Sequence, residues 1–271
     1  MPELPEVEST RLGISPTTLG QTVTKVVVRD RRLRWPVTKG LEQALTGQVV
    51  RDLKRRAKYL LIDTDAGTLV LHLGMSGSLR VTTVDEPVKP HEHIDIQFDN
   101  DTVLRLRDPR RFGAALWVKG DVFQHPLLRH LGPEPLGNEF GGGHLHTASR
   151  KKKVAVKNFV MNAKIVVGVG NIYASESLFL AGIHPNRPAG RVSEARYQVL
   201  AEHIRSVLQN AIHSGGTTLG EYFNADGEPG RYGQRLLVYG REGEPCPTCQ
   251  QPIKQKRIGQ RSSFYCSSCQ R

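Results

Sequence analysis

Between residues 20 and 118, hydrophobic residues recur in short runs that favour β-strands. Residues 22–28 and 68–73 are mainly β-branched and aliphatic, whereas residues 94–98 and 103–107 alternate between apolar and polar positions with a period of two. Turn-forming residues separate these runs, and several short strands at this spacing predict an antiparallel sandwich or barrel. A short helix is expected before them, at residues 5–14, because proline and glutamate suit a first helical turn.

The pattern changes to a helical period in the second half of the chain. The clearest helix opens at Ser193-Glu194 and ends before Gly215-Gly216. Its apolar residues recur at three- and four-residue steps, which places them on one face. These residues are Tyr197, Leu200, Ile204, Leu208 and Ala211.

Two further helices and two glycine-rich segments complete the prediction. One helix is expected to run from Ser149 through Lys157. Another is expected to start with Asn171 as its N-cap and to run to Ala181, with Gly182 ending it. The three glycines at 141–143 are typical of a linker, and the glycine-rich residues 217–234 predict a mobile loop.

The charge of the chain indicates an acidic partner. Lysine and arginine number 38 and aspartate and glutamate 26 in 271 residues, which gives a net charge of +12 and a pI of about 9.8. For a protein this basic, nucleic acid is the first candidate. No apolar stretch is long enough to span a bilayer, and the acidic start MPELPEVEST differs from a signal peptide. We therefore expect an intracellular protein without membrane contact.

Basic residues gather in four runs, at 29–34, 54–58, 107–111 and 151–157. A single run of this kind is ordinarily a solvated face. Four runs spread over both halves of the chain predict a long track along a phosphate backbone.

All four cysteines lie near the C-terminus, as two C-x-x-C pairs separated by sixteen residues. This spacing predicts a four-cysteine zinc site formed by Cys246, Cys249, Cys266 and Cys269. Four sulfur ligands leave no position for a catalytic water, so the zinc would be structural. Two disulfides or free thiols are the alternative. The basic segment between the pairs, which includes Arg261, indicates a nucleic-acid-binding finger or a solvated charged face.

Residues 165–173 contain a glycine-rich turn that leads into a predicted helix. Such a turn presents backbone N–H groups to an anion, and on a basic protein Gly168, Gly170 and Asn171 would form a phosphate clamp. A plain tight turn, with Asn171 serving only as a helix cap, is an equal alternative.

The N-terminus carries an unusual candidate nucleophile. Removal of Met1 would leave Pro2 with a free secondary amine, beside Glu3 and Glu6 and at the positive end of a helix. A neutral amine can attack an aldehyde-like carbon to form a Schiff base, and a nearby carboxylate can transfer protons. Spacing alone favours the simpler interpretation, in which the glutamates only cap the helix.

Six motifs together resemble the formamidopyrimidine-DNA glycosylases, bacterial enzymes that excise oxidised purines. The resemblance spans essentially the whole chain. In chain order, the motifs are PELPEVE at 2–8, RRAKYL at 55–60, HLGMSG at 72–77, DPRRFG at 108–113, VGVGNIYASE at 167–176 and CPTC…CSSC. The related endonuclease VIII branch typically begins PEGPE and lacks the trio that is present here as Met75, Arg110 and Phe112.

This resemblance implies an α+β multidomain fold. An N-terminal helix and β-sandwich would occupy residues 1–130, a helix–two-turns–helix domain residues 131–240, and a zinc β-ribbon with one structural Zn²⁺ residues 241–271. DNA would lie in the cleft between the halves of a monomer. Residues 217–234 would form the loop that closes over the extruded base.

The resemblance also implies catalytic roles. Pro2 would attack the sugar C1′, and Glu3 would act as the acid/base. Lys58 would transfer protons during β-elimination. Arg261 would bind phosphate and assist δ-elimination.

Further residues would hold the DNA. Asn171 would grip phosphates together with Arg261, and His91, Lys152 and Lys157 are counted as additional DNA contacts. Met75, Arg110 and Phe112 would fill the gap left by the extruded base, with Arg110 facing the orphaned cytosine. Without the resemblance, Met75 and Phe112 would more often be core residues.

The predicted function is that of a bifunctional DNA glycosylase and AP lyase. Its substrate would be double-stranded DNA with oxidised bases or abasic sites, in the bacterial cytoplasm and associated with the nucleoid. Two alternatives stay open: an endonuclease VIII-like enzyme for oxidised pyrimidines, and a non-catalytic zinc-finger DNA-binding protein.

Overall fold

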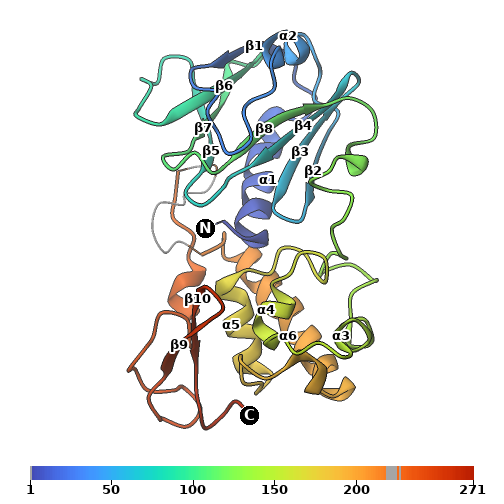
Figure 1. Cartoon of the computed structure of the whole chain (residues 1–271). Coiled ribbons are helices and arrows are strands. Elements are labelled where there is room, and N and C mark those ends of the chain that lie inside the picture. The colour runs from blue at the N-terminus through green and yellow to red at the C-terminus, as the bar shows by residue number, and fades with distance from the viewer. Residues whose placement is uncertain (1, 218–224, 226) are drawn as a thin grey trace. The chain divides into compact units, whose positions relative to one another are not determined.

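The computed structural model describes residues 2–217, 225 and 227–271, which fall into two compact units (Figure 1). Unit 1 consists of residues 1–129 and 212–233, and unit 2 of residues 130–211 and 234–271. Each unit is therefore built from two separate stretches of the chain. In the described ranges, no helix is both long and apolar enough to cross a membrane.

Unit 1 is built on a β-sandwich of two antiparallel four-stranded sheets, as the alternating pattern predicted. The first sheet has the strand order β1-β6-β7-β5 and the second β2-β3-β4-β8. Leucine, isoleucine and valine from both sheets form one shared core. The strands are β1 Val23–Val28, β2 Asp52–Arg56, β3 Tyr59–Thr64, β4 Gly67–His72, β5 Ser78–Thr83, β6 Glu92–Phe98, β7 Thr102–Arg107 and β8 Ala114–Val118.

Helix α1, Leu4–Thr18, contacts strands of both sheets and contributes Val7 and Ile14 to their core. It is longer than the helix expected at 5–14, because its buried face continues past Ile14 to Thr18. Two short helices complete this stretch of the chain, α2 Leu41–Leu45 and η1 Val122–Gln124.

Ala225 belongs to the core of the sandwich although it lies far from the strands in sequence. Its carbonyl accepts a hydrogen bond from the Val81 N–H at 3.0 Å. A Cβ at Gly13 would lie 2.7 Å from the Ala225 Cβ, so this close approach requires glycine in α1. Of the loop expected at 217–234, residues 218–224 and 226 lie outside the described residues.

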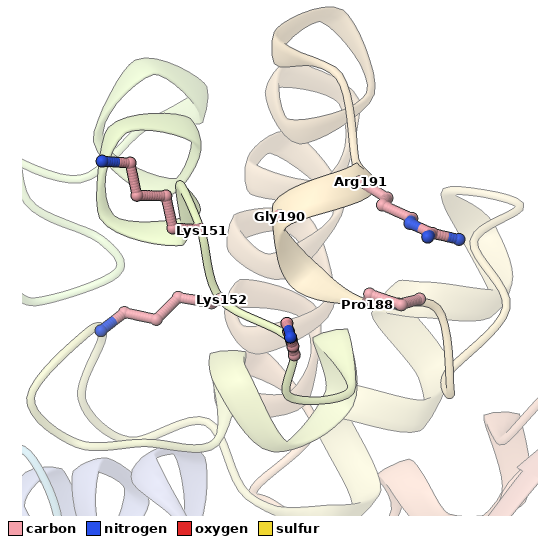
Figure 2. Close-up of a pocket in the computed structure, with 6 residues that line it drawn as sticks. Lys151, Lys152, Pro188, Gly190 and Arg191 are labelled. Atoms are coloured by element: carbon pink, nitrogen blue, oxygen red, sulfur yellow. The ribbon is translucent and has the colours of Figure 1, made fainter.

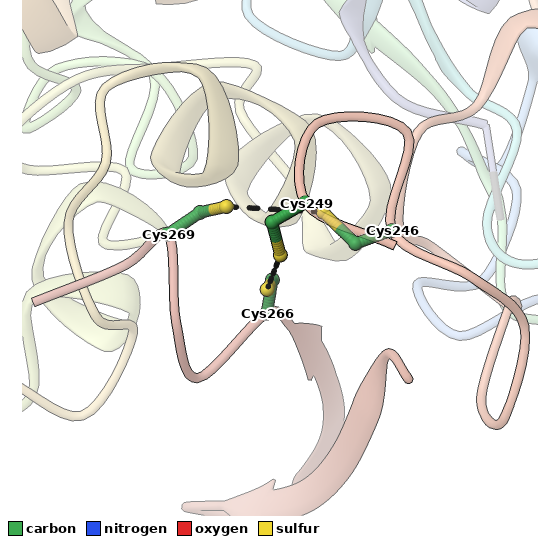
Figure 3. A group of neighbouring side chains, drawn as sticks. All are labelled: Cys246, Cys249, Cys266 and Cys269. Atoms are coloured by element: carbon green, nitrogen blue, oxygen red, sulfur yellow. Dashed lines mark hydrogen bonds between the residues drawn. The ribbon is translucent and has the colours of Figure 1, made fainter. Parts of the chain in front are cut away.

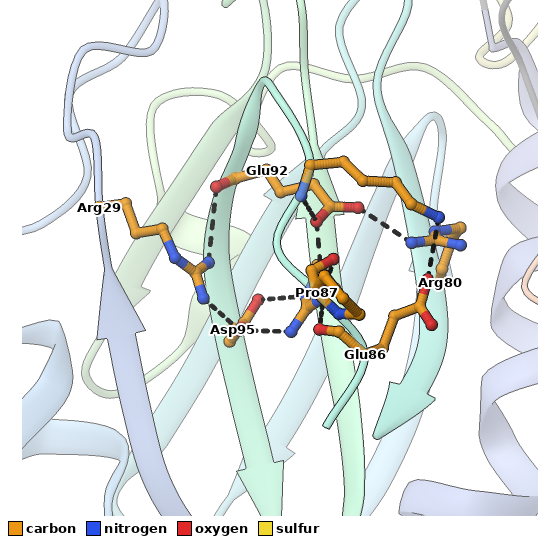
Figure 4. A network of polar contacts seen from close by, with 8 residues as sticks. Arg29, Arg80, Glu86, Pro87, Glu92 and Asp95 are labelled. Carbon is orange, nitrogen blue, oxygen red and sulfur yellow. Dashed lines mark hydrogen bonds and ion pairs between the residues drawn. The ribbon is translucent and has the colours of Figure 1, made fainter. Parts of the chain in front are cut away.

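A buried ionic network covers part of the first sheet (Figure 4). The Arg105 guanidinium donates to both oxygens of Asp95, at 2.9 and 3.1 Å, and to the carbonyl of Glu86 at 2.9 Å. Burial opposes ionisation of Asp95, but the hydrogen bonds from Arg29 and Arg105 outweigh it and hold its pKa below the ordinary value. Because Arg105 binds the Glu86 carbonyl, the network ties the segment between β5 and β6 to the sheet.

Unit 2 is mainly helical. Its longest helix, α6, confirms the predicted one, since Tyr197, Leu200, Ile204, Leu208 and Ala211 are all buried. The Tyr197 ring packs against Phe159 in α4, with ring centroids 6.1 Å apart. The elements from residue 142 onward are α3 Gly142–Ser149, α4 Val156–Val160, α5 Asn171–Leu180, η2 Ala189–Arg191, α6 Glu194–His213, η3 Tyr232–Arg235, β9 Lys254–Ile258 and β10 Arg261–Tyr265, of which α6 and η3 cross the boundary between the units.

Two local predictions in this region are wrong. The helix expected from Ser149 through Lys157 is broken at Lys151, which has a φ of +62°, and Ser149 instead ends α3. The glycines at 141–143 are not a linker, because α3 begins at Gly142. Gly142 is buried, and a Cβ there would lie 2.5 Å from the backbone of Gln198. These glycines allow the close packing of α3 against α6.

Candidate functional site

The start of helix α1 brings the predicted nucleophile and its carboxylates together. Pro2 is buried and Glu3, the N-cap residue, is 2% exposed. Glu3 and Glu6 form a capping box, in which the Glu3 N–H donates to Glu6 Oε2 at 2.7 Å and the Glu3 side chain accepts from the Glu6 N–H. The glutamates therefore do cap the helix, beside the nitrogen of Pro2.

Glu6 is fully engaged with the backbone. Its second oxygen, Oε1, accepts a hydrogen bond from the Thr217 N–H at 2.7 Å. Both carboxylate oxygens thus accept from backbone N–H groups, which holds the start of the helix. Gly216, at a φ of +86°, lies so close that an added Cβ would be 3.1 Å from Glu6 Cγ. Thr217 was not identified from the sequence, because this contact joins residues far apart in the chain.

Lys58 lies in the two-residue turn between β2 and β3, where Ala57 has a φ of +56°. Arg55 braces this turn by donating to the Ala57 carbonyl and to Glu8 Oε2, each at 3.0 Å. Because Glu8 belongs to α1, this contact connects the Lys58 turn to the helix that carries the predicted nucleophile.

The strand register places several predicted residues at the same end of the second sheet. Tyr59 pairs with His72, and His72 pairs with Ala114. The Lys58 turn, the loop after β4 and the loop before β8 therefore meet at that end. Burial, followed by the charges of Lys58 and Arg34, lowers the pKa of His72 to about 4, so its ring is neutral at pH 7. Its Nδ1 accepts a hydrogen bond from the Gly74 N–H at 3.0 Å.

The structure brings the three predicted gap-filling residues together. Gly74 has a φ of +64°, and a Cβ there would lie 2.5 Å from the Phe112 backbone, so the two loops are in direct contact. Met75 is 36% exposed and Phe112 40%, which excludes the interpretation of either as a core residue. The Arg110 guanidinium lies 5.1 Å from the centroid of the Phe112 ring.

Asp108 organises the loop that carries Arg110 and Phe112. It is 1% exposed, and its Oδ2 accepts from the Gly113 N–H at 2.8 Å. Its backbone N–H donates to the carbonyl of His91 at 3.0 Å, which joins this loop to the exposed His91. Burial raises the pKa of Asp108. Asp108 lies within a sequence motif, but only the fold shows that it connects the loop of Arg110 and Phe112 to His91.

In unit 2, Asn171 is not the N-cap of α5, because Gly170 occupies that position. The Asn171 amide instead donates to the carbonyl of Ser262 at 3.1 Å and to the hydroxyl of Tyr239 at 3.3 Å. Local propensity favoured the cap, but the side chain instead binds Ser262 in the C-terminal hairpin and Tyr239 in the segment that precedes it. Asn171 is thereby held next to the residue that follows Arg261.

Lys157 is completely buried. Its Nζ donates to the carbonyl of Ser262 at 3.0 Å and to the hydroxyl of Ser263 at 2.7 Å. Arg261, by contrast, is exposed at the start of β10. Lys157 therefore supports the strand that presents Arg261, in place of the direct DNA contact expected for it from the sequence.

Glu176 is a buried carboxylate that the sequence did not single out. It accepts hydrogen bonds from three successive backbone N–H groups, those of Leu237, Val238 and Tyr239, at 2.7, 3.0 and 2.8 Å. Burial raises its pKa, against the effect of these donors. The contacts fix the segment that leads into the cysteine-rich ribbon.

The four cysteines meet at the base of the ribbon (Figure 3). Their Sγ atoms all lie within 4.8 Å of one another, a spacing that suits four thiolates around one Zn²⁺. Gln270 supports the site by accepting from the Cys266 N–H and donating to the carbonyl of Ile183, both at 2.9 Å. Of the described residues, only these cysteines form a cluster suited to a metal.

Three family models match successive parts of the chain. The Formamidopyrimidine-DNA glycosylase N-terminal domain matches residues 1–115, and the Formamidopyrimidine-DNA glycosylase H2TH domain matches residues 131–222. A zinc finger found in FPG and IleRS matches residues 243–271. The order of these matches follows the described fold from the sandwich to the ribbon.

Known proteins resemble the chain over its full length. Formamidopyrimidine-DNA glycosylase from Syntrophotalea carbinolica is 57% identical over 271 residues, which cover 100% of both chains. Wild-type Fpg (MutM) from Lactococcus lactis, solved with DNA containing N7-benzyl-Fapy-dG, has a TM-score of 0.92 and 32% identity over 100% of both chains. The same Lactococcus lactis protein with DNA containing an abasic site has a TM-score of 0.92 and 32% identity, covering 99% of each chain.

Proposed function

Because the chain belongs to the formamidopyrimidine-DNA glycosylase family, we propose that it removes oxidised purines, such as 8-oxoguanine and formamidopyrimidines, from duplex DNA in base excision repair. It then cuts the strand at the resulting abasic site by β,δ-elimination. The observation that carries this proposal is the 57% identity to a named relative over the whole of both chains. The related structures that contain lesion or abasic-site DNA support the same substrate class.

The nucleophile in this proposal is the N-terminal amine of Pro2 after removal of Met1. The positive end of α1 disfavours a protonated amine there and so leaves the lone pair free to attack C1′. The C1′–N bond to the damaged base breaks as the N–C1′ bond forms, and the departing base takes up a proton. The amine then loses its proton, and its lone pair opens the C1′–O4′ bond to give the Schiff base, with O4′ taking up a proton. The iminium then makes the neighbouring C2′ proton acidic enough for β-elimination.

Glu3 is the proton carrier of the two glutamates. Glu6 accepts from backbone N–H groups with both oxygens, which engages it in holding the helix start. Glu3 is buried, so its proton exchange is sheltered from bulk water. We therefore assign acid/base chemistry to Glu3 and a positioning role to Glu6.

The remaining predicted residues bind and distort the DNA. Arg261 and Asn171 bind phosphates, and His91 and Lys152 make further DNA contacts. Lys58 and Arg261 assist β- and δ-elimination respectively. The exposed side chains of Met75, Arg110 and Phe112 enter the duplex and stabilise it after the damaged base has left the stack. The short contact between their two loops means that they enter as one unit.

One Zn²⁺ held by the four cysteines stabilises the ribbon and supplies no open coordination site for catalysis. We propose that the protein acts as a monomer in the bacterial cytoplasm, in association with the nucleoid. The division into residues 1–130, 131–240 and 241–271 is part of the same proposal. The three family matches follow its order, whereas residues 212–233 fold with unit 1.

The test is borohydride trapping on a duplex that carries 8-oxoguanine opposite cytosine, followed by peptide mapping. We expect the adduct on Pro2, and none with protein that retains Met1, because an amide nitrogen is not nucleophilic. An adduct on Lys58 would overturn the assignment. A parallel duplex with thymine glycol tests the endonuclease VIII-like alternative, which a clear preference for that lesion would favour.

A further inference from the structure

An open hollow of about 540 Å³ on unit 2 has four cationic side chains in its lining. It lies between the turn that follows α3 and the segment that forms η2 (Figure 2). We call it the 151–191 hollow. Its lining residues are Lys151, Lys152, Lys153, Pro188, Gly190 and Arg191, none of them acidic.

The backbone around the 151–191 hollow is firmly held. The Gly190 N–H donates to the carbonyl of Lys152 and the Ala189 N–H to that of Val154, both at 2.9 Å. A Cβ at Gly190 would lie 2.9 Å from the Lys152 carbonyl oxygen, so the two segments are in direct contact. The basic side chains therefore extend from a fixed backbone frame.

The charges around the hollow are not compensated by the protein. All four cationic side chains are exposed, and in the described part of the chain none of them has a carboxylate within ion-pair distance. The neighbouring Arg150 differs, because its guanidinium donates to Ser149 Oγ and to the carbonyl of Val192. The hollow therefore offers cationic groups, uncompensated by carboxylates, to an anionic ligand.

The arrangement of these charges suits an extended polyanion better than one compact anion. Figure 2 shows the ammonium groups of Lys151 and Lys152 on one side of the hollow and the Arg191 guanidinium on the opposite side. A sugar–phosphate backbone, with negative charges repeated along its length, can contact both sides.

We propose that the 151–191 hollow binds the backbone of duplex DNA, with Arg191 adding a phosphate contact beyond those expected for Asn171, Arg261 and Lys152. This inference rests on the proposed function, because it extends the footprint on the same DNA. Arg191 lies outside the four basic runs of the sequence, and only the fold places it opposite the lysines.

The experiment compares wild type with Arg191→Gln on duplexes that contain a stable abasic-site analogue, over a series of lengths and salt concentrations. Removing one charged side chain from a phosphate lowers the slope of log affinity against log salt by about 0.9. We expect that decrease in slope, with affinity falling roughly two- to fivefold, on long duplexes. The two proteins should become indistinguishable once the duplex is too short to reach the hollow.

The matched control is Lys119→Gln, which removes one exposed charge from unit 1 and should leave the slope unchanged. An equal effect of this control, an unchanged slope in Arg191→Gln, or an equal decrease at every duplex length would each overturn the proposal. Thermal unfolding checks that the variant is folded as stably as wild type. If the unfolding midpoint of Arg191→Gln falls, Arg191→Lys must restore the salt slope for the inference to hold.

Borohydride trapping separates this inference from the proposed function. A wild-type protein that neither binds nor is trapped on lesion duplex would refute the function itself. A wild type that is trapped normally, beside an Arg191→Gln variant with an unchanged salt slope, would refute only the role of the hollow.

Discussion

Replacing His72 with asparagine should remove a loss of stability that the wild type suffers in mild acid. Burial, with the charges of Lys58 and Arg34, lowers the pKa of His72 from 6.5 to about 4. As pH falls, the unfolded chain takes up this proton before the folded protein does. The stability contributed by the neutral ring is therefore complete above pH 6.5 and declines as pH falls towards 4.

The expected size of the effect follows from the pKa difference. Each pH unit between the two values is worth about 1.4 kcal/mol. Between pH 6.5 and 5 the wild type should lose about 2 kcal/mol at this site, and close to 3 kcal/mol by pH 4. Asparagine keeps an acceptor near the position of Nδ1 for the Gly74 N–H but cannot be protonated there.

The assay is urea unfolding at several values between pH 7.5 and pH 5, followed by tryptophan fluorescence. Both tryptophans, Trp35 and Trp117, lie in unit 1 with His72, so the signal reports on the correct unit. Effects of acid on the zinc ribbon are common to both proteins and cancel in the difference. His213→Asn, which replaces an exposed histidine of the same unit, is the matched control. Parallel stability curves for wild type and His72→Asn would refute the reasoning.

Four other outcomes test the site. Removal of zinc by a chelator should abolish tight DNA binding, because the thiolates hold the ribbon that presents Arg261; full binding by stripped protein would contradict this. Glu3→Gln should lower base excision in single-turnover assays at least ~10²-fold. Glu6→Gln, which sets an amide NH₂ against a backbone N–H, should instead lower the unfolding free energy by about 2 kcal/mol in urea. Lys157→Met should weaken binding with one zinc retained per chain, and affinity equal to wild type would refute its positioning role.

The features that local sequence predicted are those that local chemistry determines. Helix α6 was predicted because one face must be buried, whatever it packs against, and that constraint is written in the spacing of Tyr197, Leu200 and Ile204. The zinc site was predicted because each C-x-x-C pair places two ligands on one turn. The strands of the sandwich were predicted for the same reason, because burial of one face determines the spacing of their apolar residues.

The features that were missed depend on partners distant in sequence. Gly142 begins a helix because α6 lies against it, and no local pattern distinguishes that glycine from one in a linker. Asn171 does not cap the helix, because its side-chain amide donates to Ser262 and Tyr239 instead. The gap-filling role of Met75 came from the family resemblance alone, since its exposure depends on the loop contact at Gly74.

The presence of Ala225 in the sandwich core has a consequence for how this protein can be made and recombined. During synthesis, the chain must extend beyond the whole of residues 130–211 before the residue that packs on Gly13 and accepts from Val81 is available. A fragment that ends at residue 129 would lack this part of its own interior. Likewise, a chimaera that exchanges only the N-terminal segment with a relative would pair one protein's sheets with the other's closing segment. Exchanging residues 212–233 together with the N-terminal segment would keep that interior matched.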